Sequence, residues 1–271
     1  MLSGLAYMLA PVMGESEWKE ARFSAEVLRA MRGGAKVKAH VRRRAVPLPH
    51  SEYLRAVKLG LATTSYDTLL WATQTKTMFL SCGRAGELLD ADSEEYRDAK
   101  QHMRRETTYV TVDGFRSYLP YQKASPLYAG SHYFWVTADA GEDALRLISK
   151  YMRARDAKFG PTGPLWLNSK GEVPRRRWYV NRLKRFCGKQ YTGHSMRPGG
   201  ATWYVLCGAD DRTVQRLGRW KSASWEDYIR MHPEVAMAAR IRDAARRNPG
   251  LTGLGSRDAI LAALRAMGVL A

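Results

Sequence analysis

The sequence predicts a mainly α-helical domain with one small antiparallel β-sheet (an α+β fold). Apolar side chains recur at helical spacing in long segments such as residues 65–80 and 141–155. Only residues 107–112 and 115–122 are typical of strands, and Asp113–Gly114 between them favours a tight hairpin turn. With 271 residues, 45% of them hydrophobic, the chain can form one large domain with a substantial core.

The expected elements divide the chain into three parts. Residues 1–45 hold a helical pattern at 17–32 and a basic linker, residues 46–250 form the main domain, and residues 251–271 carry a C-terminal helix. The segment SCGRAGELLDA is expected to start with a turn and return to helix. Two of the expected helices after the linker are identified by their caps: one begins at Asp210 or Asp211 and runs to Leu217, and a short one at Tyr228 has the capping-box residues Ser224 and Asp227. The other expected helices are 51–59, 65–80, 141–155, 174–189, 198–207 and 257–269.

The charge of the chain favours a polyanionic partner. Lys and Arg number 44 against 26 Asp and Glu, a formal net charge of +18, which attracts nucleic acid or an anionic membrane surface. Residues 29–44 and 174–189 each contain seven basic residues and no acidic one. The second segment has one apolar and one basic helical face, which suits a DNA backbone. The residues expected to contact DNA are Arg42, Arg43, Arg44, Arg175, Arg176, Arg177, Arg182, Lys184 and Arg185.

Two further features limit the class of protein. No apolar run approaches the roughly 20 residues of a membrane span, and the apolar start of the chain lacks the basic region of a signal peptide. The three cysteines, Cys82, Cys187 and Cys207, show no CxxC spacing. They predict reduced thiols and no structural zinc. We therefore expect no membrane partner, and a location in the nucleus if the source is eukaryotic or in the cytoplasm otherwise.

The most informative segment is HSMRPGGATWYVLCGADDRTVQRLGRWKSASWEDYIR, residues 194–230. His194 and Arg197 stand three apart at the start of a helix, Trp220 follows 23 residues after the arginine, and Tyr228 eight residues later. This block resembles the signature of tyrosine recombinases, also called the phage-integrase-like family. The resemblance is closest to the branch found in eukaryotic DIRS-type retroelements and crypton-type DNA transposons.

Two upstream segments extend the resemblance to about residues 46–235. SCGRAGELL, with Arg84, is similar to the turn that carries the first catalytic arginine of the family, and LPYQKASP, with Lys123, resembles its hairpin lysine region. The resemblance implies the catalytic-domain fold and a site made of Arg84, Lys123, His194, Arg197, Trp220 and Tyr228. It also implies a 3′-phosphotyrosyl intermediate, encoding by a mobile element, and a tetramer on double-stranded DNA held together by the C-terminal helix.

The chemistry of these residue types agrees with that reading. Arg84 and Arg197 are always charged and can clamp two phosphate oxygens. His194 can donate to the phosphate or accept a proton, the Trp220 indole can only donate, and Lys123 can protonate the departing 5′ oxygen. Tyrosine is a weak nucleophile because its ordinary pKa is about 10, so Tyr228 needs this electropositive site. No metal and no nucleotide cofactor are required.

Some alternatives remain open at this stage. Arg219 competes with Trp220 for the sixth position, because it lies nine residues before Tyr228, where many bacterial relatives have histidine. Lys150 competes with Lys123. A type IB topoisomerase would use the same groups without exchanging DNA partners, and a DNA-binding descendant would have lost catalysis. A protein bound to a membrane surface would require all these matches to be coincidence. Residues 1–45 are interpreted as the remnant of an N-terminal DNA-binding helical domain plus the linker.

Overall fold

The computed structural model describes residues 45–120 and 130–220, together with isolated residues nearer the two ends of the chain. The chain divides into two compact units, Met1–Arg44 and Ala45–Ala271. Several predicted features lie outside the described residues: the linker arginines, Lys123, Tyr228 and nearly all of the C-terminal helix. No helix among the described residues is long and apolar enough to cross a membrane.

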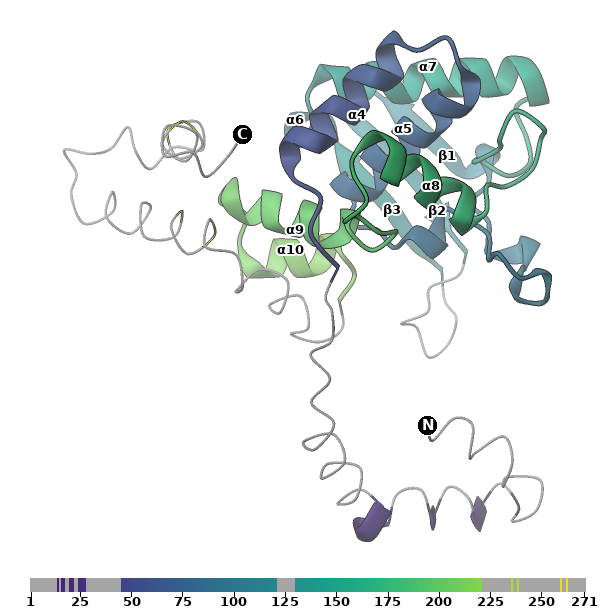
Figure 1. Cartoon of the computed structure of the whole chain (residues 1–271), viewed down its shortest axis with the longest axis vertical. Helices are drawn as coiled ribbons and strands as arrows, with labels where there is room; N and C mark the ends of the chain where they lie inside the picture. The colour runs from purple at the N-terminus through teal and green to yellow at the C-terminus, as the bar shows by residue number, and fades with distance from the viewer. Residues whose placement is uncertain are drawn as a thin grey trace, which may run out of the picture. The chain divides into compact units, whose positions relative to one another are not determined.

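Four helices build the core of the second unit. Helices α4 (His50–Ala62) and α5 (Tyr66–Leu80) lie against each other, and α7 (Glu142–Phe159) and α9 (Met196–Leu206) pack on α5 (Figure 1). All residues of α5 from 69 to 80 are buried, so this helix is the centre of the domain. The helical predictions for these segments are confirmed, and α7 extends four residues beyond the predicted end.

The small sheet has three antiparallel strands in the order β1 (Thr108–Thr111), β2 (Gly114–Leu119) and β3 (Ser131–Val136). The β1–β2 hairpin around Asp113 and Gly114 is confirmed. Strand β3 was not predicted from the sequence, and it pairs with the whole of β2, from Gly114 opposite Val136 to Leu119 opposite Ser131. One face of the sheet buries Phe115, Tyr133 and Trp135 against the helices.

The described part of the unit also contains shorter elements. These are α6 (Thr137–Ala140), α8 (Arg176–Phe186) and α10 (Asp211–Leu217), with single 3₁₀ turns η1 (Ala85–Glu87), η2 (Glu94–Tyr96), η3 (Ala99–Gln101) and η4 (Arg105–Thr107). The cap of α10 is Asp210, whose side chain accepts a hydrogen bond from the backbone of Thr213 at 2.7 Å. The expected return to helix after the Arg84 turn was wrong. Only η1 forms there, because a glycine and a glutamate that bonds back to Arg84 close the turn locally.

A buried lysine connects three of these elements. The Nζ atom of Lys76, on α5, donates to the carbonyl of Ala144 at 3.0 Å and lies 3.4 Å from the ring centroid of Trp135 on β3. Burial lowers the pKa of Lys76 well below its ordinary value. The side chain therefore holds α5, α7 and β3 together, at the cost of removing an ammonium group from water.

Candidate active site

The turn after α5 positions Arg84. Cys82 has a left-handed backbone (φ 45°), a conformation that costs energy for a residue other than glycine. A Cβ atom on Gly83 would lie only 1.4 Å from the Oη atom of Tyr133, so glycine is needed where the turn passes this ring. Arg84 follows, and its backbone N–H donates to the Glu87 carboxylate at 2.8 Å. The sequence GRAGE thus folds into a fixed turn that presents a partly exposed arginine.

Arg197 reaches the same turn from the first turn of α9. Its Nη1 atom donates to the carbonyl of Cys82 at 2.7 Å. This hydrogen bond helps to hold Cys82 in its left-handed conformation. Its guanidinium carbon lies 3.9 Å from the ring centroid of Trp220. Arg197 is only 5% exposed. Within the part of the chain that the structure describes, its Nη2 atom is buried and has no hydrogen-bond partner.

Two glycines allow α9 to come this close. A Cβ atom on Gly199 would lie 2.4 Å from the carbonyl oxygen of Leu48, and one on Gly200 would lie 1.9 Å from that of Phe79. Backbone atoms cannot move aside as a flexible side chain can. The GGAT motif therefore lets the helix that carries Arg197 pack directly on the end of α5.

Arg219 is the third guanidinium of the site. It also has a left-handed backbone (φ 54°). Its Nη2 atom donates to the Oε2 atom of Glu87 at 2.6 Å, and its guanidinium carbon lies 4.7 Å from the Tyr133 ring centroid. Its Nε atom is buried and has no hydrogen-bond partner among the described residues. Arg219 was only a competitor of Trp220 in the sequence, yet it belongs to the same cluster.

The site carries excess positive charge. Three guanidiniums, of Arg84, Arg197 and Arg219, lie around one carboxylate among the described residues, that of Glu87, whose Oε1 atom also accepts from Arg84 Nη1 at 3.2 Å. Burial, and then the neighbouring charge of Arg84, lowers the pKa of Arg197 to about 10, so Arg197 remains cationic at neutral pH. Buried cations in excess over anions are unfavourable on their own, and an anion at this place would relieve them.

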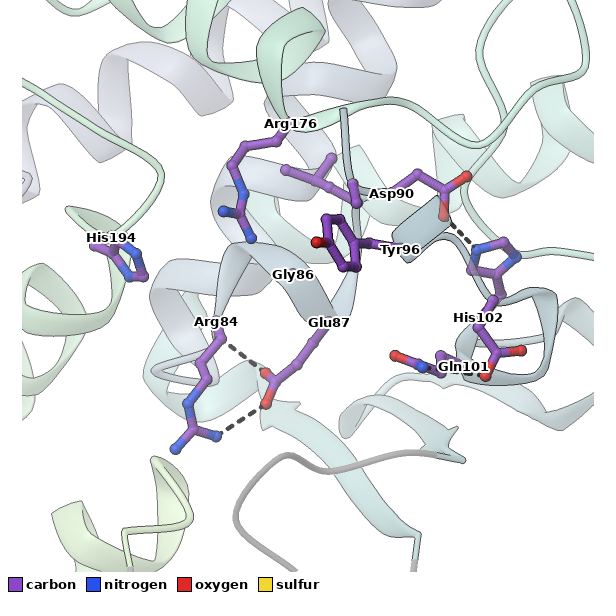
Figure 2. A pocket seen from close by; sticks show the side chains of 12 residues that line it. Arg84, Gly86, Glu87, Asp90, Tyr96, Gln101, His102, Arg176 and His194 are labelled. Carbon is purple, nitrogen blue, oxygen red and sulfur yellow. Dashed lines mark hydrogen bonds and ion pairs between the residues drawn. The ribbon is translucent and has the colours of Figure 1, made fainter. Parts of the chain in front are cut away.

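A cavity of about 360 Å³ adjoins this cluster. Arg84, Arg176 and His194 line one side of it, from three different parts of the chain (Figure 2). The opposite side holds a hydrogen bond between His102 and Asp90, with Nε2 and Oδ1 2.7 Å apart. His194 is exposed, in contrast to Arg197. The cluster is therefore open to a ligand from the side of Arg84 and His194.

Four of the six predicted site residues can thus be placed. Arg84, Arg197 and Trp220 lie together around Cys82 and Glu87, and His194 lines the adjoining cavity with Arg84. The remaining two, Lys123 and Tyr228, lie outside the described residues.

Lys150, the competitor of Lys123 named from the sequence, has structural contacts. It donates to the carbonyls of Gly60, Leu61 and Thr63 at the end of α4. Tyr191 and Tyr204, the tyrosines nearest to this region in the sequence, are buried. Glu87 forms a salt bridge with Arg84, with Nη1 and Oε1 3.2 Å apart. No group of three or more His, Cys, Asp or Glu among the described residues could hold a metal ion.

The basic face of α8 is largely exposed. The exposed basic residues here are Arg175, Arg176, Arg177, Lys184 and Arg185. Arg182 differs, because it pairs with Asp67 at 3.3 Å and its guanidinium carbon lies 3.8 Å from the Trp178 ring centroid. Arg182 therefore links α8 to the start of α5 and is less exposed than the neighbouring basic residues.

Sequence reasoning missed one part of the site, Tyr133. This ring lies beneath Gly83 and Arg219, and burial raises its pKa well above the ordinary value. A tyrosine in an unrecognised strand gives no local signal. The glycine before Arg84 was the available hint, since it marks a close approach of the backbone to something else.

The comparisons with known proteins agree with this architecture. Neither a family model nor a curated protein matches the sequence. Solved structures do match: a XerH site-specific recombinase bound to a palindromic difH substrate, in a post-cleavage complex, aligns with a TM-score of 0.53. That alignment has 13% identity and covers 90% of this chain and 71% of that one. A pre-cleavage XerH complex with difH gives a TM-score of 0.51 at 13% identity, covering 87% and 68%. The chain has the fold of a tyrosine recombinase catalytic domain.

Proposed function

We propose that this protein is a site-specific DNA recombinase or integrase that cleaves and rejoins DNA through a 3′-phosphotyrosyl intermediate. The observation that carries the proposal is the cluster of Arg84, Arg197 and Arg219. Arg84 and Arg197 are 113 positions apart in the sequence, yet their charges interact, and within the described part of the chain one carboxylate, that of Glu87, lies among the three cations. A DNA phosphodiester supplies the anion that the cluster lacks, and its transition state carries still more negative charge.

In this proposal each side chain has a distinct task. Arg84 and Arg197 bind the non-bridging oxygens of the phosphate. His194 donates to the phosphate or takes the proton of the nucleophile, and Lys123 gives a proton to the departing 5′ oxygen. Tyr228 attacks the phosphorus, the bond to the 5′ oxygen breaks, and the 3′ phosphate stays on the tyrosine. The reverse attack by a 5′ hydroxyl rejoins the strand without an energy-rich cofactor.

The Trp220 ring stacks on the guanidinium of Arg197 at 3.9 Å, so it supports the orientation of that arginine. We propose Trp220 as a further donor to the phosphate. The exposed basic residues of α8, together with the linker arginines Arg42, Arg43 and Arg44, would contact neighbouring phosphates of double-stranded DNA. Encoding by a mobile element of the DIRS or crypton type, and a tetramer held by the C-terminal helix, belong to the same proposal and rest on the sequence resemblance alone.

Covalent trapping tests the proposal. The full chain is incubated with a nicked duplex in which the nucleotides carrying the 5′ hydroxyl diffuse away after cleavage, and the products are separated under denaturing conditions. We expect a protease-sensitive protein–DNA adduct from the unmodified chain and none from Tyr228→Phe. An adduct that persists in Tyr228→Phe would mean a different nucleophile. Salt-sensitive DNA binding without any adduct would favour the descendant that has lost catalysis.

A second experiment separates the proposed recombinase from a topoisomerase. Once an adduct is found, two labelled duplexes with the same site are mixed and analysed for recombinant products. Exchange of partners supports a recombinase. Relaxation of supercoiled DNA without exchange would favour the type IB topoisomerase instead.

A further inference from the structure

The three-stranded sheet has a second face that carries aromatic side chains. Side chains alternate along a strand, so the residues between those buried in the core point to the opposite side. There Tyr109 is 54% exposed, Tyr118 40% and Phe134 42%. We call this surface the outer sheet face, defined by Tyr109, Arg116, Tyr118, His132, Phe134 and Val136.

The strand register brings these side chains into adjacent rows. Arg116 on β2 is directly opposite Tyr109 on β1 and Phe134 on β3. Its guanidinium carbon lies 5.1 Å from the Tyr109 ring centroid. In the next row Tyr118 is opposite His132, with ring centroids 6.0 Å apart. The outer sheet face therefore has two rows of side chains. In the first row the guanidinium of Arg116 lies between Tyr109 and Phe134, and the second row consists of Tyr118 and His132.

The surface is also hollowed. A shallow groove of about 390 Å³ is lined by residues that include Tyr109, Arg116, Phe134 and Val136. Large aromatic side chains gathered in one exposed patch are uncommon on a soluble domain unless they bind something.

The chemistry of the patch favours an unpaired nucleic acid strand. Aromatic rings on a sheet stack with nucleic acid bases, and an arginine among them can stack or pair with a phosphate. The residues that define the face include one arginine and one histidine, and Asp113 at the β1–β2 turn also lines the groove. An anionic strand would therefore bind toward the Tyr118–His132 row, at the opposite end of β2 from Asp113. A duplex keeps its bases stacked inside, so it cannot use these rings in the same way.

The order of residues along the chain links this face to the proposed reaction. The Tyr118–His132 row lies next to the last pair of the β2–β3 ladder, Leu119 and Ser131. The chain between those two residues contains Lys123, only four positions after Leu119. We infer that the outer sheet face binds unpaired nucleotides, namely the strand that carries the free 5′ hydroxyl after cleavage. This inference rests on the proposed function, because Lys123 is the group proposed to protonate that 5′ oxygen.

The test measures binding of single-stranded and double-stranded DNA separately. Fluorescence anisotropy with a labelled oligothymidylate of about a dozen nucleotides is compared with a duplex of the same length. We expect each of Tyr109→Ala, Tyr118→Ala and Phe134→Ala to weaken binding of the single strand about five-fold, as loss of a stacking partner does. Duplex binding should stay within two-fold, because it depends on other cations.

Two control variants make the comparison specific. Phe134→Tyr keeps a ring and should bind the single strand as the unmodified chain does. Leu54→Ala shortens an apolar side chain of similar exposure, 39%, on helix α4 and should change neither affinity. A melting curve for each variant checks that its fold is intact.

Several results would overturn the inference. The alanine variants could bind the single strand normally, or they could lose single-strand and duplex binding to the same extent. They could also change the oligomeric state, which would mean that the outer sheet face is an interface between two copies of the chain. The adduct formed by Tyr228 separates this inference from the proposed function. Normal trapping with unaltered single-strand binding in the alanine variants refutes only the role of the sheet face. Aromatic-dependent binding without any adduct leaves the face as a single-strand site and refutes its link to cleavage.

Discussion

Replacing Glu87 with glutamine tests the charge balance of the site. The Glu87 carboxylate accepts hydrogen bonds from Arg84 N at 2.8 Å, Arg84 Nη1 at 3.2 Å and Arg219 Nη2 at 2.6 Å, and its side chain is only 7% exposed. Glutamine keeps the shape but removes the charge, and its NH₂ group must face a guanidinium. The change would leave Arg84, Arg197 and Arg219 without their negative partner.

The expected loss of stability follows from the burial of this carboxylate among the cations. Removing one partner of a buried ion pair costs about 3–5 kcal/mol. Because Arg84 is partly exposed, with 27% of its side chain accessible, we expect Glu87→Gln to lower the free energy of unfolding by about 3 kcal/mol. For a unit of this size that corresponds to a melting temperature lower by roughly 6–12 °C. Urea unfolding at low ionic strength measures the change.

A matched control shares the substitution but not the burial. Glu94 pairs with Arg97 at 3.9 Å, and its side chain is 92% exposed, so Glu94→Gln should leave the stability unchanged within error. Duplex DNA should stabilise Glu87→Gln more than the unmodified chain, because a phosphate restores the missing anion. Equal stabilities of the two glutamine variants would show that the Glu87 carboxylate does not balance the charges of Arg84, Arg197 and Arg219.

Three further outcomes are expected. Gly200→Ala should lower the urea midpoint strongly, because its Cβ atom would lie 1.9 Å from the backbone oxygen of Phe79. Gly86→Ala is the control, since its Cβ atom meets only the flexible Arg176 side chain at 3.3 Å, and it should lower the free energy of unfolding by less than about 1 kcal/mol. Similar midpoints for the two variants would contradict the close packing of α9. Arg185→Gln should reduce the slope of log affinity for duplex DNA against log salt by about one, and an unchanged slope would remove Arg185 from the interface. Lys76→Met should be more stable than the unmodified chain at pH 7, by about 1 kcal/mol or more, because methionine has no charge to bury. The folded pKa of Lys76 is depressed, so the unfolded chain binds more protons between that pKa and 10.5. The free energy of unfolding of the unmodified chain should therefore rise with pH through this window and approach that of Lys76→Met. A difference in stability between the two proteins that stays independent of pH up to 10.5 would contradict burial of the Lys76 amine.

Local patterns in the sequence predicted most of the fold. Helical periodicity located α5, α7 and α9, and the Asp113–Gly114 turn located the first hairpin, because these signals lie within a few residues. Strand β3 was missed for a physical reason. It buries Tyr133 and Trp135 but also exposes Phe134, so both faces of the strand are aromatic and the apolar–polar alternation is absent.

The site was predictable as a set of residue types but not as a geometry. The motif around His194 and Arg197 and the turn at Arg84 indicated phosphate chemistry. The contact between Arg219 and Glu87 joins positions 132 apart, so no local pattern could reveal it. The sequence left Arg219 and Trp220 as alternatives for one position, whereas the structure has both beside Arg197: the indole ring stacks on its guanidinium, and Arg219 shares Glu87 with Arg84.

The most direct test of the account is to identify the amino acid that becomes joined to DNA. A trapped adduct is digested with nuclease and trypsin, and the peptides are sequenced by mass spectrometry. Trypsin releases Tyr228 in the peptide SASWEDYIR, residues 222–230, which contains a single tyrosine. We expect a nucleotide remnant on Tyr228, attached through its 3′ phosphate. A remnant on any other residue, or on a 5′ phosphate, would contradict it.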